Sequence, residues 1–275
     1  MSIFEAILLG LIQGLTEFLP ISSSAHVQIA QEILNLGSLT KPELTAFIAT
    51  IQIGTELAVI SYFFKTIVEV LKAWFRGGFR RWSDQEANAR LGWLIIIGTL
   101  PIVILGLSFQ DFLENDARQL WIIAITLIAF GLILGLSDWF GKKTRPITDL
   151  GLGSGLAFGF GQAMALIPGV SRSGGSITVG LLLGFTREAA ARYSFLLAIP
   201  AVLASGSYQF VKTYADLPGE LLLGTAVATL VSFVVGYAVI AWLLRYLTKG
   251  SYLPFVIWRV VVGSLLLLAL ATGTI

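Results

Sequence analysis

The sequence predicts an all-α protein that crosses a membrane six times and carries two further helical hairpins that enter the membrane without crossing it. Three observations support this fold class. The composition is 56% hydrophobic and only 12% charged, whereas ordinary soluble domains contain about 25% charged residues. Six segments are apolar over a membrane-spanning length. Two more apolar segments are interrupted by a proline and a cluster of serines.

The six predicted spans are uninterrupted apolar stretches. A hydrocarbon core of about 30 Å requires about 20 apolar residues per helix. The segments that meet this length are roughly 44–64, 91–109, 119–139, 190–211, 221–244 and 254–272. Segments 3–34 and 150–184 carry a proline and serines near their middle, so each is predicted to form two half-length helices joined by a turn.

The distribution of basic residues predicts the orientation. Most Lys and Arg residues fall in the loops after the first and third spans and in 184–192 and 245–251. By the positive-inside rule these loops are cytoplasmic. The opposite side then holds only Lys41, Arg118 and Lys212 among the basic residues, and an outer loop with Asp111, Glu114 and Asp116. This assignment requires segments 3–34 and 150–184 to be re-entrant hairpins, with both chain termini outside.

An internal repeat relates the two halves of the chain. The segment GLIQGLTEFLPISSS (10–24) aligns with GFGQAMALIPGVSRS (159–173), and Phe47 aligns with Phe195. Each half contains one hairpin and three spans, and an odd number of spans inverts the second half relative to the first. We therefore predict a single membrane domain over 1–275, built from inverted repeats at about 1–147 and 148–275.

The polar residues of the hairpins gather at the two predicted turns. Irregular backbone is tolerated at membrane depth only where it lines a buried or water-filled cavity. A half-helix begins after Pro20 and another after Pro168, and their free N–H groups and positive dipole ends would point into this cavity. Two converging helix N-termini, serine hydroxyls and Arg172 are typical of an anion site, and phosphate is the obvious anion.

The first turn supplies candidates for chemistry. Ser23 is the best candidate nucleophile, and His26, the only histidine, follows it by three residues and could act as a general base. A lone histidine is more often a structural group. Glu17 and Gln13 share one helix face. Because a carboxylate would repel a polyphosphate, Glu17 implies a bridging Mg²⁺ or Ca²⁺ ion or a proton-transfer role; the alternative is a protonated structural glutamate.

The second turn supplies candidates for phosphate binding. The planar fork of Arg172 suits bidentate binding of phosphate, and its alternative is a structural ion pair with Glu17. The other predicted substrate-binding residues are Ser171, Ser173, Ser176, Gly169 and Ser22. The glycine allows a close backbone approach, whereas each serine could equally be a helix cap.

Two more charged residues lie inside predicted spans. Glu56 either lines the cavity or makes a structural hydrogen bond. Arg259 lies about one turn inside the sixth span, and its long side chain is predicted to extend to the cytoplasmic interface.

The motifs QGLTEFLPISSSAH (13–26) and PGVSRSGGS (168–176) resemble the two signature motifs of the bacterial undecaprenyl-diphosphate phosphatase family, also known for bacitracin resistance. The matching positions are Gln13, Glu17, Pro20, Ser22, Ser23 and His26 in the first motif, and Pro168, Gly169, Ser171, Arg172 and Ser173 in the second. GTELAV and SFLLAIPA also resemble family segments. Gln13 stands where the family often has glutamate, and Ser176 where it usually has threonine.

The resemblance implies an enzyme of the bacterial inner membrane that hydrolyses undecaprenyl diphosphate and so recycles the cell-wall lipid carrier. It also implies a divalent cation, inverted repeats with re-entrant hairpins, and a site that faces outward. Carried over by position, Ser23 is the nucleophile, His26 and Glu17 assist it, and Arg172 holds the diphosphate. Glu17 and the neutral Gln13 are the predicted cation ligands.

The expected partners are the polyprenyl diphosphate substrate and membrane lipids. A homodimer is an open alternative, and the net charge of +2 gives no reason to expect a nucleic acid. The alternative function is a polyprenyl-phosphate transporter or flippase, because inverted repeats with broken helices are transporter architecture. Ser23 with His26 favours chemistry, since transport of an anion does not need a hydroxyl beside a base.

Overall fold

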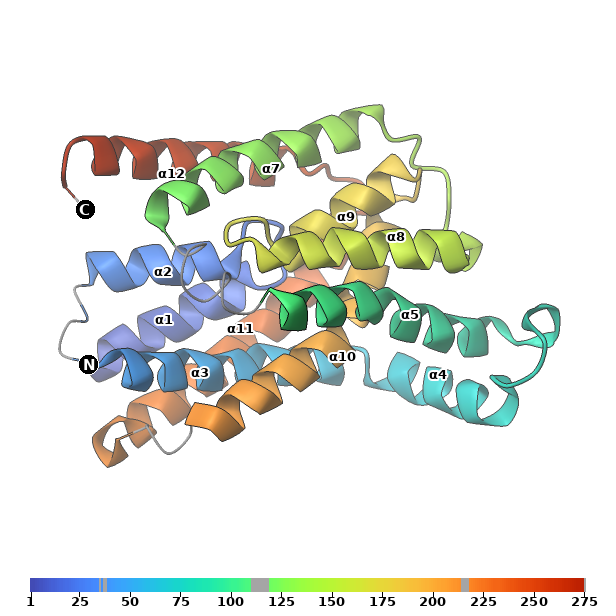
Figure 1. Cartoon of the computed structure of the whole chain (residues 1–275), viewed down its shortest axis with the longest axis horizontal. Coiled ribbons are helices and arrows are strands. Elements are labelled where there is room, and N and C mark those ends of the chain that lie inside the picture. Colours follow the sequence, from blue (N-terminus) through green and yellow to red (C-terminus); the bar gives the residue numbers. More distant parts are fainter. Residues whose placement is uncertain (35, 37–38, 110–118, 214–217, 275) are drawn as a thin grey trace.

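The computed structural model describes residues 1–34, 36, 39–109, 119–213 and 218–274, which form an elongated bundle of α-helices (Figure 1). This part of the chain contains no β-strand. The helices are α1 (Ile3–Thr16), α2 (Ser23–Ile33), α3 (Lys41–Tyr62), α4 (Phe64–Gly77), α5 (Ala87–Ser108), α7 (Leu120–Phe140), α8 (Leu152–Ala163), α9 (Arg172–Leu182), α10 (Arg187–Thr213), α11 (Leu222–Tyr246) and α12 (Leu253–Ala271). The acidic outer-loop residues Asp111, Glu114 and Asp116, and Arg118 beside them, lie outside the described residues.

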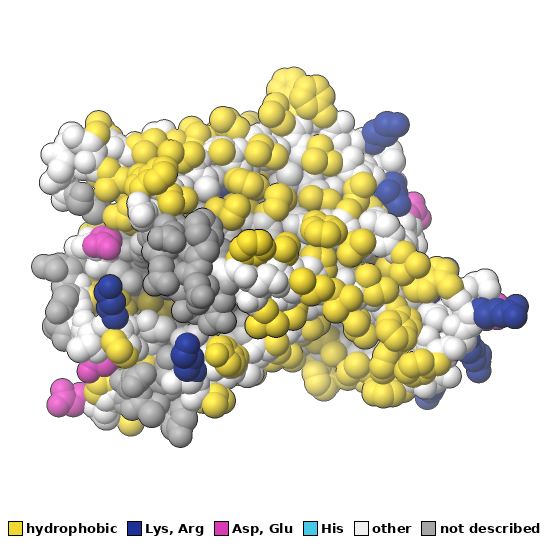
Figure 2. Space-filling model, viewed as in Figure 1, with side chains coloured by type: hydrophobic (Ala, Val, Ile, Leu, Met, Phe, Trp, Pro, Cys, Tyr) yellow, Lys and Arg dark blue, Asp and Glu magenta, His cyan; other side chains and the backbone are white. Residues whose placement is uncertain are grey.

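Six helices are long and apolar enough to cross a membrane: α3, α5, α7, α10, α11 with the turn before it, and α12. Each overlaps one of the six spans predicted from the sequence. Yellow hydrophobic side chains cover the middle of the face in Figure 2, and Lys and Arg side chains gather at the end where α4 meets α5. The chain is a multi-pass membrane protein, as its composition predicts.

The stretch after the first span, predicted as a loop, forms helix α4. Val70 and Ala73 are buried at helical spacing where α4 packs against α5, while Lys65, Lys72 and Arg76 are exposed. A helix with one apolar stripe and one charged face needs a partner for the stripe. Charged residues dominate the sequence of this stretch, so the sequence predicts a loop and not a helix.

Segments 3–34 and 150–184 each form two short helices joined by a turn that contains the proline, as predicted. In Figure 1, α1 begins and α2 ends at the end of the bundle that carries both termini, whereas α8 begins and α9 ends at the opposite end. The start of α9 contacts the first turn directly, because Ser173 Oγ donates a hydrogen bond to the Leu19 carbonyl oxygen at 3.2 Å.

Small residues allow the short helices to lie close to the spans beside them. A Cβ on Gly10 of α1 would lie 2.4 Å from the Ala228 carbonyl oxygen of α11, and one on Gly159 of α8 would lie 2.2 Å from the Gly98 carbonyl oxygen of α5. Lipid tails are as apolar as leucine, so close packing of this kind stabilises helix association in a membrane. The first helix of each hairpin is therefore fixed by the same kind of contact.

Candidate active site

The two proline turns end with the same backbone geometry. Ser22 and Ser171 directly precede α2 and α9, with φ angles of 75° and 77°. Such left-handed conformations cost a non-glycine residue about 1–3 kcal/mol and are concentrated at functional sites. The residues that follow, Ser23 and Arg172, are thus the first residues of two equivalent helices, each 11 residues long.

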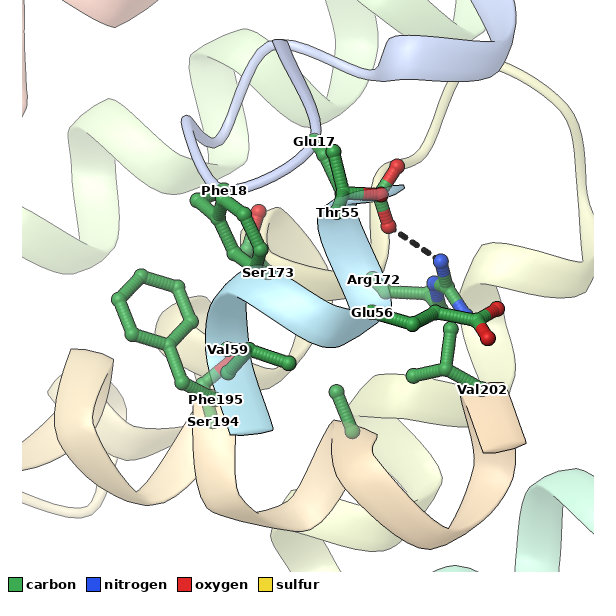
Figure 3. Close-up of a pocket in the computed structure, with 11 residues that line it drawn as sticks. Glu17, Phe18, Thr55, Glu56, Val59, Arg172, Ser173, Ser194, Phe195 and Val202 are labelled. Atoms are coloured by element: carbon green, nitrogen blue, oxygen red, sulfur yellow. Dashed lines mark hydrogen bonds and ion pairs between the residues drawn. The ribbon is translucent and has the colours of Figure 1, made fainter. Parts of the chain in front are cut away.

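The carboxylate of Glu17, at the end of α1, connects the two turns. Its Oε2 accepts hydrogen bonds from Ser23 Oγ at 2.6 Å and from Gln13 Nε2 at 2.9 Å. Its Oε1 forms an ion pair with Arg172 (Figure 3). These side chains are 9% and 22% exposed, so solvent screens the pair weakly. The structure therefore brings together four residues that the sequence predicts to act in one site.

A small cavity lies beside this ion pair, between the turns and helices α3 and α10 (Figure 3). Its polar lining is Glu17, Thr55, Glu56, Arg172, Ser173 and Ser194. Phe18, Val59, Phe195, Ala198 and Val202 complete the wall. An apolar cavity with a few converging polar groups is the usual form of a small-molecule site.

Glu56 belongs to this cavity. The residue is only 5% exposed, and its Oε1 has no hydrogen-bond partner among the described residues. Of the two alternatives that the sequence leaves open, the structure supports the first, because Glu56 lies in the cavity wall.

Two of the predicted phosphate-binding serines have partners within the protein. Ser176 Oγ donates to the Arg172 carbonyl oxygen at 2.7 Å and lies 2.5 Å from Ser194 Oγ. Ser171 Oγ accepts the Gly174 N–H at 3.1 Å, which is the geometry of a helix N-cap. Both side chains hold α9 in place.

Of the other predicted binding residues, Gly169 and Ser22 have structural roles, and Ser173 lines the cavity. Gly169 adopts φ 93°, and a Cβ there would lie 2.0 Å from Thr126 Oγ1, so the glycine is required by the turn. Ser22 is 1% exposed, and its Oγ lies 3.2 Å from Ser24 Oγ. Ser173 is the one serine of the predicted set that lines the cavity.

His26 is not paired with Ser23, which donates its hydrogen bond to Glu17 instead. The Trp258 indole Nε1–H donates to His26 Nε2 at 2.7 Å, and the planes of the two rings lie within 13° of each other. With Nε2 as the acceptor, the ring proton lies on Nδ1 and is donated to the Ser22 carbonyl oxygen at 2.8 Å. In this arrangement the base nearest to Ser23 is Glu17.

Arg259 is buried, and the prediction that it reaches the cytoplasmic interface is wrong. It is 0% exposed, and its guanidinium donates to five backbone carbonyl oxygens. The acceptors are Pro20 at 3.0 Å, Gly169 at 2.8 Å, Val170 at 3.0 Å, Leu127 at 3.1 Å and Thr126 at 3.4 Å. An arginine inside an apolar span, where charge is costly, is the sequence signal for such a role.

The family model described as bacitracin resistance protein BacA matches residues 6–265. The chain belongs to this family. It is 54% identical over 271 residues to undecaprenyl-diphosphatase 2 of Agrobacterium fabrum, covering 98% of this chain and 96% of the relative. It is 52% identical to an undecaprenyl-diphosphatase of Pseudarthrobacter chlorophenolicus and 50% identical to one of Micrococcus luteus, covering 100% of this chain and 99% of each relative. The resemblance inferred from the two motifs is confirmed.

The acidic residues of this BacA-family site could bind a hard divalent cation only together with water and a bound phosphate compound. Among the described residues, no group of three or more His, Cys, Asp or Glu side chains could hold a metal ion. The cavity offers two carboxylates, Glu17 and Glu56, and one oxygen of Glu56 is buried without a partner. Mg²⁺ is usually bound by one or two carboxylates together with waters and substrate phosphates. The residues present fit such a cation.

Replacing Arg259 by methionine tests the role of the buried guanidinium. In the variant Arg259→Met the new side chain is apolar and of similar length, but it leaves carbonyl oxygens of both turns without their donor. Each buried polar group left unpaired costs about 1–3 kcal/mol. We therefore expect the free energy of unfolding, measured by circular dichroism in detergent, to fall by at least about 2 kcal/mol. Arg245 is exposed on α11, so Arg245→Met should leave the free energy of unfolding unchanged. Equal stability of the two variants would contradict the role of the Arg259 guanidinium.

Proposed function

We propose that this protein hydrolyses undecaprenyl diphosphate to undecaprenyl phosphate and inorganic phosphate in the cavity beside the two proline turns. The observation that carries the proposal is the hydrogen bond from Ser23 Oγ to Glu17 Oε2, with Arg172 on the other oxygen of the same carboxylate. A nucleophile aligned with a base that a third group orients is the signature of covalent catalysis. The full-length relatives named undecaprenyl-diphosphatase support this choice of substrate. The reaction would recycle the cell-wall lipid carrier and confer bacitracin resistance.

In the proposed first step, Ser23 Oγ attacks the terminal phosphorus and transfers its proton to Glu17. The bond between this phosphorus and the bridging oxygen breaks, and undecaprenyl phosphate leaves with that oxygen. Water then attacks the phosphoserine, the Oγ–phosphorus bond breaks, and inorganic phosphate is released as Ser23 recovers its proton. A role for His26 in protonating or deprotonating a group in these steps stays a prediction.

The residues proposed to bind the diphosphate are the cationic and N–H groups at the starts of α2 and α9. Arg172 can place two parallel N–H groups on phosphate oxygens. The first-turn N–H groups of α2 have no side-chain cap and carry the positive end of the helix dipole, whereas in α9 the Gly174 N–H is already donated to Ser171 Oγ. Ser173 Oγ lines the same cavity. The exposed apolar surfaces of the spans would accommodate the prenyl chain in the membrane.

The proposed reaction also uses a divalent cation, Mg²⁺ or Ca²⁺, which would offset the negative charge of the diphosphate. Glu17 is the proposed ligand on the first turn. The Gln13 amide nitrogen donates to Glu17 Oε2 and, at 3.4 Å, to Thr55 Oγ1. Gln13 therefore orients the Glu17 carboxylate, and only its amide oxygen could ligate a cation.

We further propose that α1–α2 and α8–α9 are re-entrant hairpins of two inverted repeats. The two first helices begin at Ile3 and Leu152, and the two second helices at Ser23 and Arg172, so both offsets are 149 residues. The packing supports the same relation, because α1 packs against α11 and α8 against α5, each in the other half of the chain. With the basic end of the bundle in the cytoplasm, both termini lie outside. The site would then face outward, the side from which α1–α2 enters.

Phosphate release from labelled undecaprenyl diphosphate by the purified protein in detergent tests the proposed activity. Ser23→Ala should lower kcat by several orders of magnitude but leave lipid binding largely intact, because a nucleophile adds little to ground-state affinity. Ser264→Ala, an exposed serine on α12, is the matched control and should behave as wild type. A protein that only transports the lipid would release no phosphate, and that result would favour the transporter.

Cysteine labelling tests the proposed orientation, because the chain contains no cysteine. Ser83 and Thr274 are both exposed. The connection from α4 to α5, which contains Ser83, lies at the end of the bundle opposite the C-terminus (Figure 1). In intact cells a membrane-impermeant maleimide should label Thr274→Cys, and it should label Ser83→Cys only after lysis. Labelling of Ser83→Cys in intact cells would contradict the proposed orientation and indicate the opposite one.

A further inference from the structure

Glu56 has the surroundings of a ligand-binding acid. It lies in the C-terminal half of α3, a candidate membrane span, and its Oε1 is buried without a partner in the described part of the chain. An unpaired buried polar atom costs about 1–3 kcal/mol, and more when the group is charged. Among the described residues that line the cavity, the one cationic side chain is Arg172, which is already ion-paired with Glu17.

The surrounding residues direct this carboxylate into the same cavity as Glu17. In Figure 3 the carboxylates of Glu17 and Glu56 lie on either side of the Arg172 guanidinium. The hydrogen bond from Gln13 Nε2 to Thr55 Oγ1 fixes α3 against α1, which carries Glu17. A Cβ at Gly206 of α10 would lie 2.2 Å from Glu56 Oε1. Only glycine at position 206 leaves room for the carboxylate where it is.

The charges in the cavity favour a cation as the missing partner. With both acids ionised, Glu17, Glu56 and Arg172 together carry one net negative charge. A diphosphate would add at least two more, and like charges a few ångströms apart repel strongly away from bulk water. A hard divalent cation removes this repulsion, and carboxylate and phosphate oxygens are the ligands it prefers.

We infer that Glu56 is a second carboxylate ligand, with Glu17, of the divalent cation used in the reaction. This inference rests on the proposed function and names a ligand that neither sequence motif contains. Gln13 presents its amide nitrogen to Glu17 and Thr55, so α3 contributes the second acid that α1 lacks. Two carboxylates leave most coordination positions to water and phosphate. Cation and diphosphate therefore bind cooperatively.

Mn²⁺ binding to the purified full-length protein tests this assignment without using turnover. The free ion is measured by electron paramagnetic resonance, in the presence and absence of methylene diphosphonate as a non-hydrolysable head group. Wild-type protein should bind Mn²⁺ more tightly when the diphosphonate is present. Glu56→Gln should weaken that binding by at least about tenfold. Glu69→Gln, an exposed acid on α4, should bind as wild type.

Two further variants keep the test independent of any folding defect. Gly206→Ala leaves the charge of Glu56 unchanged but displaces its carboxylate, so it should also weaken Mn²⁺ binding. Adding Gln13→Glu to Glu56→Gln supplies a carboxylate from α1 and should restore part of the affinity. Recovery in the double variant would show that Glu56→Gln is folded.

The outcomes separate the inference from the proposed function. Wild-type Mn²⁺ affinity in both Glu56→Gln and Gly206→Ala, with normal phosphate release by the wild-type protein, would overturn only the role of Glu56. Affinity lost equally in Glu69→Gln would also overturn it, because the binding would then reflect general surface charge. Absence of phosphate release from the wild-type protein would overturn the proposed function, whatever the Mn²⁺ affinities are.

Discussion

The buried guanidinium of Arg259 is the contact on which the arrangement of the site depends. It donates to carbonyl oxygens of the first proline turn, of the second proline turn and of α7. Turns at membrane depth expose carbonyl oxygens that lipid cannot satisfy. One arginine, with donors spread across a rigid plane, satisfies both turns at once. In doing so it fixes the distance between the starts of α2 and α9.

Because the two turns are held together, the same backbone geometry places a candidate nucleophile at one turn and a candidate phosphate-binding residue at the other. Ser23 and Arg172 occupy the same position in their respective hairpins, directly after a serine with positive φ. The first residue of α2 is a nucleophile candidate and the first residue of α9 a phosphate-binding candidate. Glu17 contacts both, so the carboxylate that orients the hydroxyl also positions the arginine. The strain at Ser22 and Ser171 is offset by the contacts that hold the turns.

The sequence predicts well those features that depend on local pattern. Apolar length places the six spans, and a proline beside serines marks each turn, because both signals arise within one segment. Helix α4 is missed because its charged residues outweigh a short apolar stripe. The sequence left two roles open for Arg172, phosphate binding and an ion pair with Glu17. In the structure the ion pair is present, where the start of α9 meets the first turn.

Features that depend on distant contacts could not be predicted. The partners of Arg259 are carbonyl oxygens, which every residue carries and which leave no trace in the sequence. The Trp258 indole meets His26 from the other end of the chain, so the spacing of His26 from Ser23 suggested a pairing that this structure does not contain. Glu56 gives a similar lesson, since only the folded structure shows that it lines the same cavity as Glu17.

In the proposed mechanism, Ser23, oriented by Glu17, attacks the terminal phosphorus of the substrate. This attack is tested by rapid acid quench of the purified protein mixed with undecaprenyl diphosphate labelled in its terminal phosphate. We expect labelled phosphoserine at residue 23, which forms before free phosphate accumulates and is absent from Ser23→Ala. Phosphate release at a normal rate with no labelled protein at any quench time would contradict it. That result would indicate direct attack by water.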